Sequence, residues 1–160
     1  MALECALFYT NANGIQGDNT VAARANSSEV IEVQHETMIG RNASGHTTGR
    51  RQHGPLRVLK QLDRATVLLR KALVENQVQP ELELRWYRPH PMGTGEIQHF
   101  FSIILRNAAV SKTDTLLPNT LNPELARLHP QEWVEFVYET VAWRWIDGGI
   151  EHEDTWGQIV

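Results

Sequence analysis

Residues 130–145 read Pro-Gln-Glu-Trp-Val-Glu-Phe-Val-Tyr-Glu-Thr-Val-Ala-Trp-Arg-Trp, and apolar side chains alternate with polar ones along most of this segment. An alternation with period two is typical of a β-strand that has one buried face. In the first half, the large apolar residues share one parity: Val134, Phe136 and Tyr138. In the second half, they share the other: Val141, Trp143 and Trp145. The change predicts a β-bulge near Glu139 and Thr140, a device that curves sheets into barrels.

Other segments of the chain show similar strand patterns. Strands are predicted at residues 3–9, 30–39, 55–61, 81–88 and 96–110. Within residues 30–39, the alternation places Ile31 and Val33 on one face. The residues that we expect to be mostly buried in a single core share the inward parities: Leu82, Leu84, Trp86, Phe101, Ile103, Phe136 and Trp143.

One segment has the period of a helix instead. Asp63 is the expected N-cap. Apolar residues follow it at helical spacing: Ala65, Leu68, Leu69, Ala72 and Leu73. The helix should end near Asn76, ahead of Pro80. Residues 115–130 contain three prolines and are predicted to be a connection that holds a short helical turn.

These segments predict about seven strands, mostly antiparallel, around one helix. We assign residues 1–160 to a single, mainly β domain, namely a small antiparallel β-barrel or two-sheet sandwich with one α-helix. Residues 146–160 are predicted to be an extended C-terminal tail. Their run Glu151-His-Glu-Asp154 is typical of a solvated segment.

The composition is that of an ordinary globular domain, with 160 residues, 41% hydrophobic, 21% charged and a net charge of −4. No apolar run reaches the roughly 18 residues of a membrane span, so no membrane insertion is expected. The N-terminus lacks the basic start of a Sec signal peptide, and none is expected. A single cysteine, Cys5, excludes an internal disulfide and a Cys-rich zinc site.

Sequence motifs for catalysis are missing. The segment Gly14-Ile-Gln-Gly17 lacks the Lys-Ser/Thr of a phosphate loop. No serine sits in a Gly-x-Ser-x-Gly elbow, and no two histidines have the spacing of a metal-binding pair. We therefore expect no catalytic residue, no cofactor and no metal. A small β-barrel enzyme is an alternative for which no acid–base pair has a suitable spacing.

Charge is unevenly distributed along the chain. Residues 41–71 hold eight basic side chains and one acid, whereas residues 132–154 hold seven acids and one base. The basic loop has no aromatic residues between its arginines, so a nucleic-acid partner is not expected. Unlike charges on one chain indicate self-association. We expect Trp133 and Trp156 at subunit contacts, because exposed tryptophan tends to mark interfaces.

Residues 40–54, which follow Ile39, are predicted to form a long loop. The loop contains no large apolar side chain, so it cannot pack against the core of its own domain. A connection of this length is usually functional. The side chains expected to make its contacts are basic or imidazole groups: Arg41, His46, Arg50, Arg51 and His53.

Four motifs carry a resemblance to a known family. Residues 60–73 (Lys-Gln-Leu-Asp-Arg-Ala-Thr-Val-Leu-Leu-Arg-Lys-Ala-Leu) resemble a strand-to-helix junction. Residues 130–143, quoted above up to Trp143, resemble a terminal strand, parity change included. Residues 14–17 (Gly-Ile-Gln-Gly) and 31–33 (Ile-Glu-Val) resemble a first turn and a second strand. All four are similar to segments of Hcp, the haemolysin-coregulated inner-tube protein of bacterial type VI secretion systems.

The resemblance implies a protomer that closes into a hexameric ring, with rings stacked into a tube that a contracting sheath expels. Its implied partners are copies of itself and the sheath, baseplate, spike and effector proteins. Its implied location is cytoplasmic before firing and extracellular afterwards. The loop 40–54 then corresponds to the element that contacts the next ring, and Asp63 becomes a candidate for contact with another subunit. Phage tail-tube proteins share the fold, so a tail-tube protein of a phage or related contractile particle is the alternative.

Overall fold

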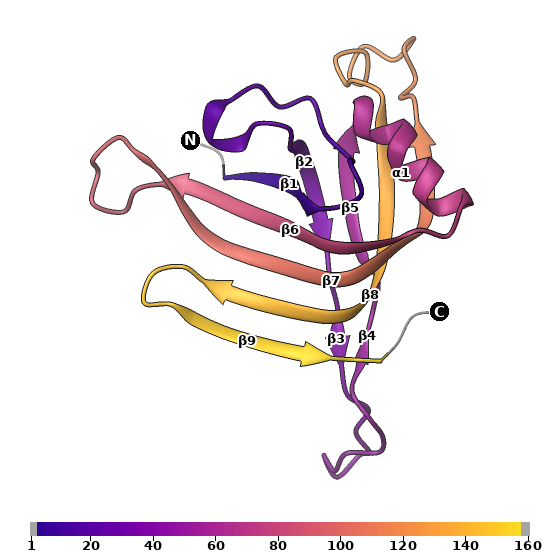
Figure 1. Ribbon diagram of the computed structural model, residues 1–160, viewed down its shortest axis with the longest axis vertical. Helices are drawn as coiled ribbons and strands as arrows, with labels where there is room; N and C mark the ends of the chain where they lie inside the picture. Colours follow the sequence, from indigo (N-terminus) through magenta and orange to yellow (C-terminus); the bar gives the residue numbers. More distant parts are fainter. Residues whose placement is uncertain (1–2, 158–160) are drawn as a thin grey trace.

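The computed structural model describes residues 3–157. Strands predominate in this part of the chain, and a single α-helix accompanies them (Figure 1). In order, the elements are β1 (Glu4–Asn11), the 3-10 turn η1 (Ala22–Arg24), β2 (Ser28–Gln34), β3 (Thr37–Met38), β4 (Gln52–His53), β5 (Leu56–Gln61), α1 (Arg64–Val74), β6 (Val78–Pro89), β7 (Ile97–Leu116), β8 (Gln131–Trp145) and β9 (Ile150–Thr155).

Seven strands form one sheet in the order β5-β2-β1-β6-β7-β8-β9, and each neighbouring pair is antiparallel. An additional pairing of β5 with β8 closes the first six strands into a barrel, which leaves β9 outside the closure. Helix α1 lies along one side of the barrel (Figure 1). The predicted fold class, a small antiparallel β-barrel with one helix, is confirmed.

The core lies between the barrel wall and the inner face of α1. Ala65, Leu69 and Ala72 of the helix are buried, as their spacing predicted. Of the predicted core residues, four are buried: Leu82, Leu84, Ile103 and Phe136. The other three are partly buried and pack against the same cluster: Trp86, Phe101 and Trp143. The predicted parities are therefore correct.

In the second half of β8, Val141 is buried and Trp143 is partly buried, as predicted, but Ala142 is buried too and Trp145 is exposed instead of inward. The predicted bulge at Glu139 and Thr140 is wrong. The register of β8 against β7 is continuous across this point. The register shift lies farther along β7, between Val110 and Lys112. The parity changes where β8 leaves one partner for another, because residues 131–136 pair with β5 and residues 140–145 pair with β9.

Two other segments differ from their predictions. The strand predicted at residues 30–39 ends at Gln34, and a register shift against β5 between Val30 and Glu32 leaves Ile31 exposed instead of inward. The predicted C-terminal tail contains a strand, since β9 pairs with the second half of β8. The acidic run is thus part of the sheet. Residues 158–160 lie outside the described part of the chain.

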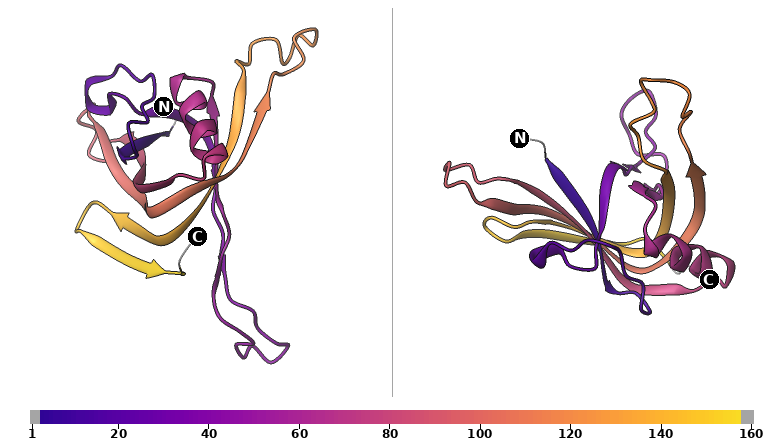
Figure 2. Two further views of the ribbon diagram at one scale, coloured as in Figure 1. Left: turned by 45° about the vertical axis from the view of Figure 1, so that its right-hand side comes forward. Right: turned by 90° about the horizontal axis from the view of Figure 1, so that it is seen from above.

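The loop 40–54 forms most of a long hairpin, which we call the hairpin and define as residues 35–54. Its two strands pair at Thr37↔His53 and Met38↔Gln52, and a bridge joins Arg41 to Thr47. The hairpin projects away from the barrel, on the opposite side from the connection between β7 and β8 (Figure 2). Residues 41–51 are all exposed. The expectation that this segment leaves the barrel is therefore correct.

Candidate functional site

A buried ion network joins the start of α1 to the barrel wall. Lys60 of β5 and Glu132 of β8 are register partners, and both side chains are fully buried. The Lys60 Nζ atom lies 2.6 Å from Glu132 Oε1 and 2.8 Å from Asp63 Oδ1. Charges removed from water must be paired to be tolerated. One ammonium therefore holds two carboxylates at the strand-to-helix junction.

Hydroxyl groups extend this network to the N-terminal strands. Thr66 donates to Glu132 Oε1 at 2.8 Å and accepts from the backbone N–H of Asp63 at 3.1 Å, which completes a capping box. Ser28 donates to Asp63 Oδ2 at 2.5 Å and lies 2.8 Å from the Tyr9 hydroxyl. Burial raises the pKa of Tyr9. Asp63 is the predicted N-cap, and its carboxylate is bound within its own chain.

Four residues of this network belong to the motifs that carried the family resemblance in the sequence. Lys60, Asp63 and Thr66 come from one motif, and Glu132 comes from the other. Sequence reasoning treated the two motifs as separate because 66 positions separate Thr66 from Glu132. The closure of the barrel between β5 and β8 brings them together.

A second polar cluster contains histidine, serine and glutamate, but it does not have the geometry of a catalytic triad. His99 Nε2 lies 2.7 Å from Ser102 Oγ, and Ser102 donates to Glu83 Oε1 at 2.8 Å. In a triad the carboxylate orients the imidazole, whereas here it binds the serine, which is fully buried. Burial opposes ionisation of Glu83, but hydrogen bonds from Arg85 and Ser102 outweigh it and lower its pKa.

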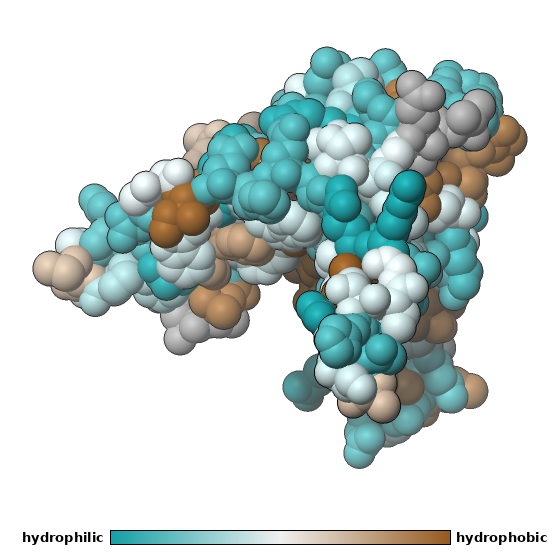
Figure 3. Space-filling model, turned by 90° about the horizontal axis from the view of Figure 1, so that it is seen from below, coloured by the Kyte–Doolittle hydropathy of each residue, from teal (hydrophilic) through white to brown (hydrophobic). Residues whose placement is uncertain are grey.

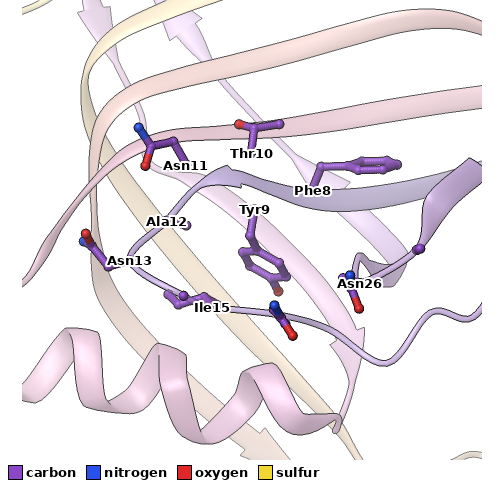
Figure 4. A pocket seen from close by; sticks show the side chains of 11 residues that line it. Phe8, Tyr9, Thr10, Asn11, Ala12, Asn13, Ile15 and Asn26 are labelled. Atoms are coloured by element: carbon purple, nitrogen blue, oxygen red, sulfur yellow. The ribbon is translucent and has the colours of Figure 1, made fainter.

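A pocket near the N-terminus is lined by uncharged side chains. It has a volume of about 450 Å³ and lies where the end of β1 meets the following loop (Figure 4). Its walls are residues 8–16 together with Ala25 and Asn26, and they include no carboxylate, imidazole, amine or thiol. Among residues 3–157, no three His, Cys, Asp or Glu side chains gather in a way that would hold a metal ion.

The base of the hairpin is packed with aromatic and imidazole rings. His35 Nε2 lies 2.6 Å from the Tyr138 hydroxyl, which donates to Gly54 O at 3.1 Å. The Trp143 ring stacks against His35 and His53, with centroids 6.2 and 6.1 Å away. His53 was expected to be a contact residue of an exposed loop, but its side chain is fully buried. It lies in β4, at the root of the hairpin and not in its projecting part.

The other residues that the sequence predicted to make contacts lie partly on the hairpin and partly elsewhere in the chain. Arg41, His46 and Arg50 are exposed on the projecting part of the hairpin. Trp156 is 44% exposed, and its ring lies edge-on to His53 at 5.7 Å. Trp133 is partly buried in β8, with a guanidinium of its own chain, that of Arg57, 4.6 Å from its ring centroid.

Asp154 of β9 reaches the hairpin root. It accepts a hydrogen bond from Arg51 Nε, and its Oδ2 atom lies 2.7 Å from His53 Nε2. The hydrogen bond from Arg51 is the largest cause that holds the pKa of Asp154 at about 2, well below its ordinary 3.8. The predicted solvated run therefore provides a carboxylate that stays ionised over the physiological pH range.

Acidification should destabilise the fold through two histidines. Burial, followed by repulsion from His53, lowers the pKa of His35, and burial followed by Arg85 lowers the pKa of His99. The unfolded chain therefore binds protons near pH 6.5 that the folded chain does not, so stability decreases as the pH falls below that value. Urea unfolding between pH 7.5 and 5 should show this decrease. The double variant His35→Gln, His99→Gln should show a flatter dependence, and an equally steep loss would contradict the assignment.

Comparison with known proteins gives a consistent result. Residues 9–145 match the family described as "Type VI secretion system effector, Hcp". The "Major exported protein" of Pseudomonas aeruginosa PAO1 is 32% identical over 123 residues, which cover 76% of this chain and 70% of that protein. A mutant form of the Hcp1 protein from the E. coli EAEC 042 pathovar superposes with a TM-score of 0.80 at 29% identity, covering 98% of this chain and 99% of that one. Hcp3 from Pseudomonas aeruginosa, at 19% identity, has a TM-score of 0.71 over 98% of both chains and supports the fold alone.

The family match over residues 9–145 and the likeness to a solved Hcp1 structure therefore place the chain among the proteins of type VI secretion. The chain belongs to the Hcp family, as its four motifs predicted. This is a family of secreted structural proteins and not a family of enzymes. Within residues 3–157, no helix has the length and apolar character needed to cross a membrane.

Proposed function

We propose that this chain is the subunit of a hexameric ring, and that its rings stack into the expelled inner tube of a type VI secretion system. The observation that carries the proposal is the hairpin, which extends a polar, basic segment beyond the barrel and presents it to a neighbour. Seen from the side on which the hairpin projects, the surface is mainly hydrophilic (Figure 3). Such a segment is suited to contact a charged surface rather than to fill a core.

Charge complementarity supports stacking between copies of the chain. The projecting part of the hairpin holds the exposed Arg41 and Arg50, and the exposed Asp147, in the turn between β8 and β9, is a carboxylate without an ion-pair partner among the described residues. An exposed ion pair contributes only about 0–1 kcal/mol. A ring repeats each pair in every subunit, and simultaneous contacts reinforce one another. Weak individual pairs are therefore sufficient to hold two rings together.

The remaining partners follow from the same proposal. The tube would meet sheath, baseplate and spike proteins and would carry effectors, without catalysis and without a cofactor of its own. The subunit would be cytoplasmic before firing and extracellular afterwards. The exported relative in Pseudomonas aeruginosa supports secretion.

Reversing charge on the hairpin tests this proposal. Arg41 and Arg50 are the suitable positions, because Arg51 is already bound to Asp154 of its own chain. The double variant Arg41→Glu, Arg50→Glu should melt at the parental temperature and keep the parental mass under native conditions. It should no longer form tubes, as seen by electron microscopy, and it should not be secreted.

The matched control is Arg41→Lys, Arg50→Lys, which keeps both positive charges and should form tubes. Raising the salt concentration should weaken stacking of the parent protein, since exposed ion pairs are screened. If the charge-reversed variant forms tubes at low salt as well as the parent does, the hairpin is not the stacking element.

A further inference from the structure

The hairpin has few contacts of its own to fix its direction. Beyond its root, the two strands pair only with each other, at the rungs of β3 and β4 and at the bridge between Arg41 and Thr47. An isolated two-stranded hairpin is only marginally stable in water. Its direction relative to the barrel must therefore be set by the groups at its root.

The strand β8 restrains one side of that root. The Tyr138 hydroxyl lies within hydrogen-bond distance of His35 on one arm of the hairpin and donates to Gly54 O on the other. Trp143 of the same strand stacks on the imidazoles of both arms, His35 and His53. These contacts anchor the two arms at the barrel wall, at the point where they leave it.

The strand β9 restrains the second side through charged groups. Asp154 accepts from Arg51 Nε, and its Oδ2 atom is 2.7 Å from His53 Nε2. Arg51 also donates from Nη2 to Thr155 O at 3.2 Å. Trp156 covers His53 from the outside. A charge-assisted hydrogen bond is stronger than a neutral one, so Asp154 adds a charged contact to the neutral ones that β8 makes with the hairpin.

We propose that β9 is a strut, and that Asp154 is the positioning residue through which it fixes the direction of the hairpin relative to the barrel. The strut lies outside the family match, which ends at residue 145. The effect on hairpin direction does not depend on assembly. Only its consequence for ring stacking rests on the proposed function.

Pulsed electron paramagnetic resonance on the full chain measures this direction. Spin labels are placed at Ser44→Cys, near the hairpin tip, and at Glu75→Cys, at the end of α1, and labelled protein is diluted with unlabelled protein so that only distances within one chain contribute. The natural Cys5 is buried, and its pKa is raised to about 12, so it stays unlabelled. We expect Asp154→Ala to widen the distance distribution roughly twofold. Glu153→Ala is the matched control on the same strand and should leave it unchanged, because Glu153 pairs with Arg106.

A second variant removes the contact from the other side. Arg51→Gln leaves the sequence of β9 intact and should widen the distribution as Asp154→Ala does. If both variants fold and keep the parental width, the strut is refuted. If the distribution widens but tubes still form as in the parent, the strut is supported and the stacking role of the hairpin is contradicted.

Discussion

Replacing Lys60 by methionine is expected to lower the free energy of unfolding by about 3–5 kcal/mol, the usual loss when one partner of a buried ion pair is removed. Methionine is close to lysine in length, so the loss comes from charge and not from a cavity. Without the ammonium, the carboxylates of Glu132 and Asp63 lose the cation that they share. The Glu132 carboxylate has a further weakness, since its Oε2 atom has no hydrogen-bond partner within the described residues.

Two comparison variants make this expectation specific. Asp63→Ala should lose less, about 1–2 kcal/mol, because Glu132 still pairs with Lys60 and only the cap and the contacts of Asp63 with Lys60 and Ser28 are lost. The double variant Lys60→Met, Glu132→Leu should recover most of the loss, since a buried pair can be replaced by apolar groups at little cost. Urea unfolding measures all three variants. A loss below about 1 kcal/mol for Lys60→Met would show that the network is not essential to stability.

Truncating Phe136 to alanine is expected to have an effect of similar size, about 3–5 kcal/mol. The Phe136 side chain is fully buried, opposite Leu56 on one neighbouring strand and Val110 on the other. Its removal leaves a cavity at the point where β8 joins both strands, and the closed barrel has little freedom to collapse into it. The denaturation midpoint should fall while the dependence on denaturant concentration stays constant.

The matched comparison is Trp143→Ala in the second half of the same strand. Sequence parity alone predicts a loss equal to that of Phe136. Trp143 is only partly buried and packs against His35 and His53 at the hairpin root. We therefore expect a smaller loss, about 2 kcal/mol, in line with ordinary substitutions. If the two losses have the reverse order, the division of β8 into a core half and a hairpin-root half is wrong.

Local periodicity explains why most of the barrel and the helix could be predicted from the sequence. The helix shows its spacing within eleven residues, from Arg64 to Val74, and Asp63 marks its start. Likewise, β6 shows Leu82 and Leu84 on one parity. Each of these signals lies within a few residues of the structure that it specifies.

The strand β9 and the burial of His53 were not predicted, because both depend on partners that are far away in the sequence. The strand β9 has few apolar residues, and its pairing is supported by cross-strand ions such as Arg144 with Glu151. His53 sits in a polar stretch, and its burial is caused by Trp143 and Asp154, about a hundred positions away. No local pattern in the sequence of β9 or around His53 indicates which distant residues pack against it. The sequence motifs contain the four charged and hydroxyl residues at the centre of the ion network. That these residues meet follows only from the pairing of β5 with β8, which closes the barrel.

The position of β9 outside the closed barrel has a consequence for aggregation. Closure removes the free edges of the first six strands, and within residues 3–157 β9 is the outermost strand of the main sheet. An unpaired edge is a template for fibril-like association. In β9, however, three of six residues are acidic: Glu151, Glu153 and Asp154. Each of these carboxylates is held in an ion pair with an arginine of its own chain, Arg144, Arg106 and Arg51. A strand added at this edge would have to fit beside three charged pairs, so the edge resists pairing with its own copy.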